Sequence, residues 1–194
     1  MPFSAAIPEP LSFASQPLSA ARRAPTVWFT GLPSAGKTTI ARLLAERLNR
    51  AAYRVELLDG DELRECISSD LAFSSADRNE NIRRIGFIAG LLSRNGIIVL
   101  VAAVSPYREA RDKMREWLGD FVEVYVNAPL HVCERRDPKG LYRRARAGQL
   151  SPFTGIDDPY EPPVRPEIEC RTDLEDPEKC VRTVARFLCN RLSV

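Results

Sequence analysis

Histidine and paired cysteines are what this sequence has least of. It contains one histidine, and no Cys-x-x-Cys pair occurs among its five cysteines. Zinc sites are built from Cys and His ligands at short, regular spacings, so a Cys/His zinc site is not expected. An odd number of cysteines without such spacing is also a poor disulfide framework. We expect reduced thiols in or near the core, as in a cytosolic protein.

An excess of charge and a long apolar run are missing as well. Lys and Arg number 28 against 26 for Asp and Glu, a formal net charge of +2. So small a surplus gives no general argument for nucleic acid or an acidic membrane surface, although basic residues cluster at 78–84 and at 135–146. No apolar run approaches the roughly 20 residues of a membrane span. We expect one domain of ordinary size, with neither nucleic acid nor membrane as partner.

Residues 1–25 differ in composition from the rest of the chain. They are rich in Ser, Ala and Pro and have no clean helical or strand period. A basic start followed by an apolar block is missing, so a secretory signal is not predicted. Arg22 and Arg23, with Glu9 as the only acid, leave an organellar transit peptide open. We favour a flexible N-terminal extension over 1–25, a single domain over 26–194, and a cytoplasmic location unless 1–25 is a transit peptide.

From residue 26 onward, apolar strand patterns alternate with helical ones. This order predicts an α/β fold of three layers, a parallel β-sheet flanked by helices on both faces. The loop over 152–166 is long for a connection inside one domain, and such loops are functional or disordered. The predicted strands are 26–31, 53–61, 97–104 and 121–129, and the predicted helices are 37–51, 81–96, 108–119 and 176–192, with short helical pieces at 130–137 and 140–148.

The segment GLPSAGKT, residues 31–38, matches G-x-x-x-x-G-K-[ST] between a predicted strand and a predicted helix. In this motif successive backbone N–H groups and a helix N-terminus bind phosphate oxygens. Lys37 would reach the β- and γ-phosphates and the Thr38 hydroxyl would ligate Mg²⁺. No N-K-x-D guanine motif occurs, which favours ATP over GTP. The predicted ATP-binding residues here are Gly31, Leu32, Pro33, Ser34, Ala35, Gly36, Lys37, Thr38 and Thr39.

Two acids form the next candidate cluster. The apolar strand over 97–104 ends at Ser105 rather than at an acid, whereas Asp59 and Asp61 end the second strand. In nucleotide-kinase-like folds this position commonly faces the acceptor, which points to a small-molecule kinase. One carboxylate could accept the hydroxyl proton while the other orders Mg²⁺ or the acceptor. A strand-end turn with a helix cap is the alternative.

Basic residues supply the remaining candidates. Arg78 and Asn81 lie one helical turn apart, so they share a face and could hold an anionic acceptor. A solvated helix start explains them equally well. Six basic residues fall within 135–146, just before the long loop. They form either a basic lid over the phosphates or a solvated amphipathic helix.

Six segments taken together resemble the adenylylsulfate (APS) kinase family, whose members phosphorylate the 3′-hydroxyl of adenosine 5′-phosphosulfate with MgATP. The resemblance spans about residues 25–192 and implies a P-loop nucleotide-kinase-like fold with a basic lid. The family is commonly dimeric, so a homodimer is expected. The segments are GLPSAGKT, LLDGDELR, FSSADRNENIRRI, VSPYREAR, RRDPKGLYRRARAG and FTGIDDPYEPP, in this order.

The resemblance also implies roles for single residues. Asp61 would orient or deprotonate the 3′-hydroxyl, Asp59 is the other acid of the pair, and Lys37 acts on the phosphates. Ser105 matches a serine described as phosphorylated in the family, and we interpret it as an acceptor-site residue. Arg135 matches a lid residue near the ATP purine. Phe73 and Phe153 match the pair that sandwiches the APS adenine; the other residues expected at the acceptor are Arg64, Arg78, Asn81, Val104, Pro106 and Lys139.

Several positions depart from the family pattern. Pro33-Ser34 stands where Ser-Gly is typical, and Ser151-Pro152 replaces a usual Lys-Gly, so a cation near the acceptor is lost. His131 is expected on the surface, and Trp28 and Trp117 in the core. No ATP sulfurylase segment is expected. Two alternatives remain: a related kinase acting on another nucleotide conjugate, or a catalytically silent nucleotide-binding regulator.

Overall fold

The computed structural model describes residues 23–192, which form a parallel sheet between two layers of helices. The strands are β1 (Thr26–Thr30), β2 (Val55–Asp59), β3 (Ile98–Ala102), β4 (Phe121–Asn127) and β5 (Ile168–Arg171). Their order in the sheet is β2-β3-β1-β4-β5, and every neighbouring pair is parallel. The predicted three-layer α/β fold is confirmed.

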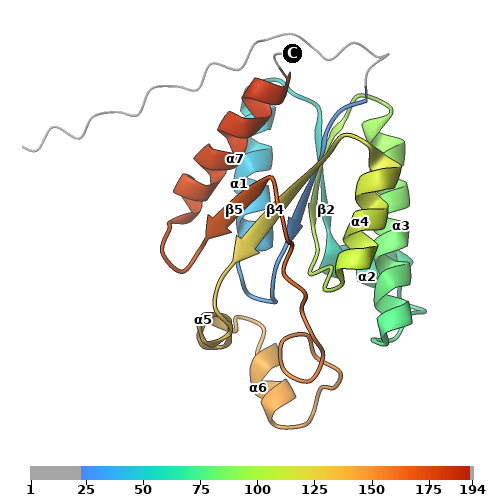
Figure 1. Cartoon of the computed structure of the whole chain (residues 1–194), viewed down its shortest axis with the longest axis vertical. Helices are drawn as coiled ribbons and strands as arrows, with labels where there is room; N and C mark the ends of the chain where they lie inside the picture. The colour runs from blue at the N-terminus through green and yellow to red at the C-terminus, as the bar shows by residue number, and fades with distance from the viewer. Residues whose placement is uncertain (1–22, 193–194) are drawn as a thin grey trace, which may run out of the picture.

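Two helices cover each face of the sheet (Figure 1). α1 (Lys37–Arg50) and α7 (Pro177–Leu192) pack together on one face, and α3 (Ser75–Ser93) and α4 (Arg108–Leu118) pack together on the other. Three short helices, α2 (Gly60–Ile67), α5 (Leu130–Arg136) and α6 (Leu141–Arg146), lie toward the carboxyl ends of the strands. That edge is where open parallel sheets bind ligands.

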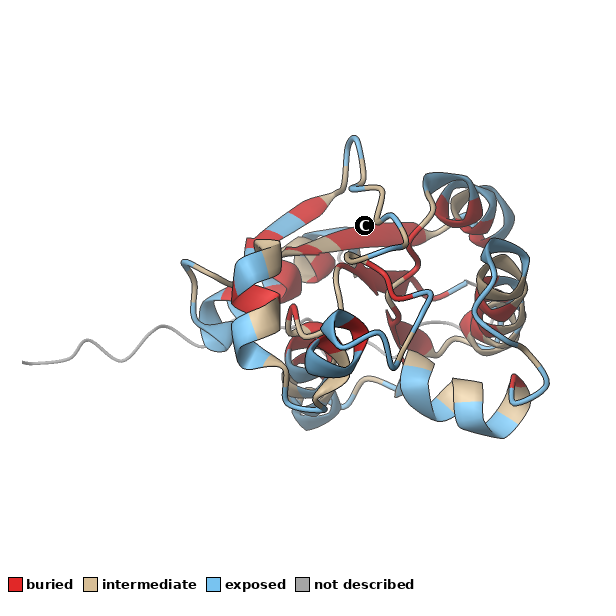
Figure 2. Cartoon of the chain, turned by 90° about the horizontal axis from the view of Figure 1, so that it is seen from below, coloured by how far each residue is buried: buried red, intermediate tan, exposed pale blue. Residues whose placement is uncertain are grey.

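The core is divided by the sheet into two apolar clusters. One joins the sheet to α1 and α7 and includes Phe29, Leu44 and Val184; the other joins it to α3 and α4 and includes Trp28 and Ile85. β1 and β3 are buried along their whole length, as strands covered on both faces must be. Figure 2, seen from the edge with the carboxyl ends, shows buried residues in the strands and on the inner faces of helices.

Several element boundaries differ from those predicted. β2 ends at Asp59, and Asp61 lies in α2 rather than at the end of a strand. α3 begins at Ser75, six residues before the predicted start, because Ser74 and Asp77 form a capping box. β5 was not predicted at all. Trp28 is buried as expected, but the core prediction for Trp117 is wrong: its side chain is 47% exposed and stacks on the exposed ring of Phe87.

None of the helices within residues 23–192 combines the length and the apolar character that crossing a bilayer requires.

Candidate active site

The phosphate-binding loop connects β1 to α1 at the carboxyl edge of the sheet. Glycine is required at its first position, because a Cβ on Gly31 would lie 2.3 Å from the carbonyl oxygen of Val126. Gly36 has φ 106°, a left-handed conformation that favours glycine. Ser34 has φ 62°, also left-handed, at the position where a glycine is typical of the family pattern. The loop keeps the required conformation even though Ser34 replaces that glycine.

Lys37 is buried beneath the loop and donates hydrogen bonds to two of its carbonyl groups. The Nζ atom lies 2.9 Å from the oxygen of Gly31 and 2.8 Å from that of Leu32. The side chain is 8% exposed, and loss of hydration lowers the pKa of its ammonium group to about 8, against the opposing effects of Asp61 and Asp59. A phosphate would be a stronger partner for this cation than two carbonyl groups are.

Side chains outside the loop bind its next three carbonyl groups. The Tyr142 hydroxyl donates to Pro33 at 3.0 Å. Arg136 Nη1 donates to Ala35 at 3.3 Å, and to Ser34 at 3.5 Å. Carbonyl groups that are bound on the outside of a loop leave its N–H groups toward the other side, as an anion-binding nest requires. Sequence analysis places both residues in the segment RRDPKGLYRRARAG but does not predict their contacts with the loop, because neither belongs to the loop motif.

Thr38, Asp59 and Asp61 form the next part of the site. The Thr38 hydroxyl donates to Asp59 Oδ2 at 2.9 Å, and Asp59 Oδ1 accepts from the Asp61 backbone N–H at 3.0 Å, capping α2. Among residues 23–192 there is no group of three or more His, Cys, Asp or Glu side chains arranged for a metal. A hydroxyl and a carboxylate in contact suit Mg²⁺, which prefers oxygen ligands and takes few from protein when phosphates supply the rest.

Lys139, in the loop between α5 and α6, forms an ion pair with Asp61 on α2. The two charged groups lie 2.6 Å apart and both are exposed. The bond to Asp61 raises the pKa of the Lys139 ammonium group. This contact joins the basic lid to the predicted catalytic acid.

Arg78 connects the start of α3 with the long loop over 152–166. Its guanidinium donates to the carbonyl groups of Phe73 and Pro152, each at 3.0 Å, and pairs with Asp158 at 3.3 Å. The ring of Phe73 is 43% exposed, and the Arg64 guanidinium lies 4.3 Å from its centroid. Two segments that are far apart in the sequence therefore meet at Arg78.

Phe153 is held differently from Phe73. Its ring is 7% exposed and meets the ring of Tyr142 edge to face, with centroids 4.9 Å apart. The Asp157 carboxylate accepts from the Phe153 N–H at 2.5 Å and from the Ser151 hydroxyl. Ser151, which stands where a lysine is usual, thus forms a hydrogen bond to Asp157, six residues further along the same segment. The structure brings both phenylalanine-bearing segments to Arg78, but the two rings have different environments.

Ser105 and its neighbours, which follow β3, make hydrogen bonds to β1 and to the loop over 152–166. The Ser105 hydroxyl oxygen accepts from Trp28 Nε1 at 2.9 Å, and the residue is buried with φ 48°. The Val104 carbonyl accepts from the Thr30 hydroxyl at 2.7 Å, and the Pro106 carbonyl accepts from the Glu161 N–H at 2.8 Å. Asn81, on α3, is also buried, and its Oδ1 atom has no hydrogen-bond partner among the described residues.

The lid carries the remaining predicted residues. Arg135 is exposed on α5 and lines a hollow of about 340 Å³ with side chains of α5 and α6, including Tyr142 and Arg146. His131 is exposed, as predicted. Arg136, the neighbour of Arg135, is the lid residue that donates to the phosphate-binding loop.

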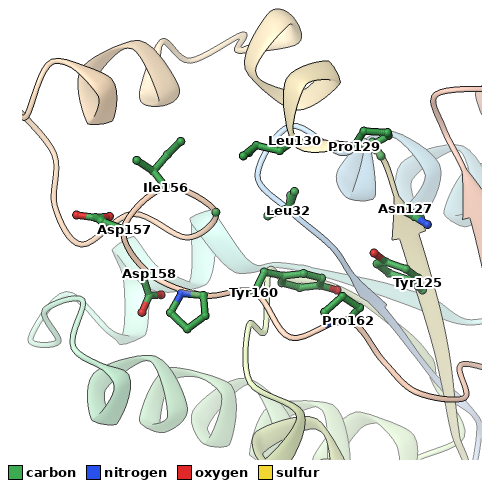
Figure 3. Close-up of a pocket in the computed structure, with 13 residues that line it drawn as sticks. Leu32, Tyr125, Asn127, Pro129, Leu130, Ile156, Asp157, Asp158, Tyr160 and Pro162 are labelled. Carbon is green, nitrogen blue, oxygen red and sulfur yellow. The ribbon is translucent and has the colours of Figure 1, made fainter.

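A larger pocket of about 600 Å³ lies beside the loop, and sequence analysis did not predict it (Figure 3). Leu32 and the end of β4 form one side, and residues 155–162 form the other. The rings of Tyr125 and Tyr160 stack inside it with centroids 6.2 Å apart. Tyr160 lies in the segment FTGIDDPYEPP and Tyr125 lies in β4, so only the folded chain brings the two rings together.

A phosphate-binding loop after the central β1, with carboxylates at its side and a basic lid above, defines a P-loop phosphotransferase. The family model described as adenylylsulphate kinase matches residues 23–171. An adenylyl-sulfate kinase of Picosynechococcus is 61% identical over 166 residues, which make up 86% of this chain and 94% of that protein. The chain therefore belongs to the adenylylsulfate kinase family.

Solved structures agree with this assignment. That of the Mycobacterium tuberculosis APS kinase in complex with AMPPNP and APS has a TM-score of 0.82 and 44% identity, and covers 86% of this chain and 98% of that chain. A hexameric APS kinase from Thiobacillus denitrificans has a TM-score of 0.65 and 35% identity, over 89% of this chain and 30% of that chain.

Proposed function

We propose that this chain transfers the γ-phosphoryl group of MgATP to the 3′-hydroxyl of adenosine 5′-phosphosulfate, giving 3′-phosphoadenosine 5′-phosphosulfate (PAPS) and ADP. The observation that carries the proposal is the contact of Thr38 with Asp59, which joins the phosphate-binding loop to the acid pair. Membership of the adenylylsulfate kinase family supports the same reaction.

On the donor side, the loop from Gly31 to Thr39 binds the triphosphate. Lys37 leaves the carbonyl groups of Gly31 and Leu32 and donates to the β- and γ-phosphates, and Arg135 lies near the purine. Thr38 and Asp59 would hold Mg²⁺, which when bound supplies positive charge to the phosphate oxygens. The protein thus places cations around the group in which negative charge develops.

On the acceptor side, the oxygen of the 3′-hydroxyl bonds to the γ-phosphorus and ADP departs. Asp61 accepts the proton that this hydroxyl loses. Lys139 turns from Asp61 to the phosphosulfate, since an exposed ion pair costs about 1 kcal/mol or less to break. Arg78 and Asn81 bind the same ligand. Further contacts to APS come from Arg64, Phe73, Val104, Ser105, Pro106 and Phe153.

Turnover with defined acceptors tests the proposal. Purified protein with MgATP is assayed for ADP release with APS, with other nucleotide conjugates and with no acceptor. We expect ADP release only in the assay that contains APS as the acceptor. Release with another conjugate instead would identify a related kinase. Absent turnover in a protein that binds ATP would identify a silent regulator, the alternative from a different class.

Assembly and location extend the proposal. We infer a homodimer in the cytoplasm. Of the extension predicted over 1–25, residues 1–22 lie outside the described residues, and residues 23–25 form hydrogen bonds with the domain. Sedimentation velocity decides the assembly: a single species at twice the chain mass is expected, and a monomer or a hexamer would contradict it.

A further inference from the structure

We propose that Asp158 is a positioning residue for the acceptor: it holds the guanidinium group of Arg78 in the orientation that binds the anionic groups of APS. This inference rests on the proposed function, which places Arg78 in contact with APS. Asp158 itself contacts no substrate in this proposal and acts only through Arg78. Its contacts with Arg78, with its own turn and with the start of α4 support the assignment.

Arg78 is held at a point where its side chain is largely shielded from solvent. The Nε atom donates to the Phe73 carbonyl and the Nη2 atom to the Pro152 carbonyl, each at 3.0 Å, and Nε lies 3.3 Å from Asp158 Oδ2. A guanidinium group carries five N–H donors in one plane. Within residues 23–192 no hydrogen bond joins another residue to Nη1, so this atom remains for an anionic ligand.

Asp158 is the acid that forms an ion pair with Arg78 in the described part of the chain. The two side chains are 12% and 13% exposed, against 61% and 72% for the pair of Lys139 and Asp61. Water and salt weaken an exposed pair, whereas a shielded pair keeps more of its attraction. Because a charged acceptor binds a guanidinium group more strongly than a carbonyl group does, Asp158 is the partner best able to fix the orientation of Arg78.

Asp158 is fixed in turn by contacts of its own. Its Oδ1 atom accepts from the Tyr107 hydroxyl at 2.8 Å, and its Oδ2 atom, which is paired with Arg78, accepts from the Thr154 hydroxyl at 3.3 Å. The Asp158 carbonyl accepts from the Gly155 N–H at 2.7 Å, which closes the turn that begins at Thr154. Burial and the bond to Asp158 raise the pKa of the Tyr107 phenol, so its hydroxyl remains a donor. The carboxylate therefore has one oxygen for Tyr107 and one for Arg78.

Tyr107 stands directly before α4, where three hydrogen bonds hold the long loop against the start of the helix. Besides the bond of Tyr107 to Asp158, the Glu161 N–H donates to the Pro106 carbonyl and the Arg108 N–H donates to the Glu161 carboxylate, each at 2.8 Å. The position of Asp158 is thus set from α4, which packs on the sheet, whereas the arginine that it orients belongs to α3. A side chain that is oriented before its ligand arrives loses less conformational entropy on binding.

The charge of Asp158 has a second effect that opposes the first. A carboxylate repels an anionic ligand, so Asp158 also weakens the attraction between Arg78 and APS. The geometry of the contacts favours the first effect, because Asp158 approaches Nε while Nη1 remains available to the ligand. We therefore expect orientation to outweigh repulsion. The two effects change the KM for APS in opposite directions, so kinetics can distinguish them.

Steady-state kinetics with APS or MgATP as the varied substrate provide the test. Asp158→Ala leaves Arg78 with carbonyl partners alone, so the KM for APS should rise about three- to tenfold, the cost of immobilising one long side chain. The kcat and the KM for ATP should stay within about twofold, as expected when only the binding of one substrate is weakened. Tyr107→Phe keeps the charge of Asp158 and removes the hydrogen bond that orients it, so the KM for APS should rise about two- to threefold.

A double-mutant cycle shows whether Asp158 acts through Arg78. The ratio kcat/KM for APS is measured from initial rates at low APS in the wild type, Asp158→Ala, Arg78→Ala and the double variant. If Asp158 acts only by orienting Arg78, adding Asp158→Ala to Arg78→Ala should change kcat/KM by less than about twofold. A purely structural role in folding the loop would lower kcat/KM in both backgrounds and would overturn the inference.

Glu161→Gln is the matched control. It removes the same charge from the same loop and keeps an oxygen for the Arg108 N–H, so the KM for APS should stay at its wild-type value. A lower KM for APS in Asp158→Ala would show that repulsion dominates, and an unchanged KM would show that Arg78 needs no partner; either result overturns the inference. Should Asp158→Ala not fold, an unchanged KM for APS in Tyr107→Phe overturns it. Failure of the proposed function is distinct, because the wild type would then show no APS-dependent ADP release.

Discussion

At the scale of single residues, Lys37 should make ATP binding depend on pH above neutrality. Its pKa is lowered to about 8 in the free protein because the ammonium group is buried. A bound triphosphate raises that pKa, since negative charge favours the protonated form. Binding therefore takes up a proton as the pH rises beyond 8, and the affinity should fall by up to about tenfold per pH unit there. Below pH 7, Lys37 is protonated in both the free and the ATP-bound protein, so it adds no pH dependence to the affinity for ATP.

Calorimetry in two buffers with different ionisation enthalpies measures this proton uptake. At pH 9 the observed enthalpy of ATP binding should differ between the buffers, and at pH 7 Lys37 should contribute no difference. Lys37→Met is the control, with weaker binding and no uptake at pH 9. Equal enthalpies at pH 9 in the wild type would show that Lys37 is protonated before ATP arrives.

Ser105 is the second residue for which the structure sharpens an expectation. Its hydroxyl oxygen is bonded to the Trp28 indole and is buried, which favours a structural contact over a phosphorylated intermediate. Ser105→Ala should keep turnover within about tenfold, a barrier change of about 1.4 kcal/mol or less. Loss of the bond should reduce the free energy of unfolding by about 1 kcal/mol. Steady-state kinetics and urea denaturation check both, and abolished turnover in the folded variant would contradict the prediction.

Motif residues could be predicted from the sequence because their spacing carries the chemistry. Lys37 and Thr38 follow from the phosphate-binding pattern; in the structure Lys37 donates to the Gly31 carbonyl and Thr38 donates to Asp59. The contacts of Arg136 and Tyr142 with the phosphate-binding loop could not be predicted, because each spans more than 100 positions of sequence. Which of two adjacent arginines faces that loop depends on the helical phase of α5, and a seven-residue helix leaves that phase open.

At the scale of elements, Asp59 has two tasks that substitutions can separate. Its carboxylate caps α2 and accepts from Thr38. Asp59→Asn keeps a good capping oxygen but loses the charge, so the melting temperature should be nearly unchanged while kcat falls about 10–100-fold. Asp59→Ala loses both, and the missing cap should lower the melting temperature by a further ~2–4 °C. Equal melting temperatures with equal kcat losses would show that the cap contributes nothing.

Most elements were predictable, including the short helices α5 and α6, but β5 and α2 were not. α1, α4 and α7 follow from apolar periodicity, and the buried β3 from its continuous apolar run. β5 has four residues that alternate between buried and exposed, too few to distinguish it from a loop, and only pairing with β4 makes it a strand. The start of α3 was missed because the signal there is a polar capping box rather than an apolar stripe. The position of Asp61 was also wrongly predicted, because α2 is a short helix that begins with a polar cap and its first residues were assigned to the end of β2.

At the scale of the whole molecule, a buried ionic group joins the sheet to the loop over 152–166. Arg111 on α4 bonds Glu123 of β4 at 2.8 Å and donates to the carbonyl groups of Ser105 at 2.5 Å and Glu161 at 2.7 Å. Buried charges persist only when they are fully paired, so this set fixes the loop relative to the sheet. That loop is therefore anchored to the core, whereas the ion pair of Lys139 with Asp61 is exposed to solvent.

The boundary of the domain gives the last prediction. Ala24 is fully buried, its N–H donates to Ser93 at 3.0 Å, and its carbonyl accepts from the Ser93 hydroxyl at 2.5 Å. Arg23 donates to Leu118 at 3.3 Å, and the Pro25 carbonyl accepts from Val99 at 3.1 Å. These bonds lie at the amino ends of the strands, opposite the site.

Two truncated proteins, each starting with an initiator methionine, should therefore differ in melting temperature. Removal of residues 1–22 keeps these bonds and should leave the melting temperature within about 1 °C. Removal of 1–25 breaks four hydrogen bonds worth about 0.5–1.5 kcal/mol each, which should lower the melting temperature by at least ~4 °C. Both should keep the wild-type kcat at 20 °C, because no described contact of residues 23–25 reaches the site. A lower kcat or melting temperature after removal of 1–22 alone would place residues 1–22 within the working domain.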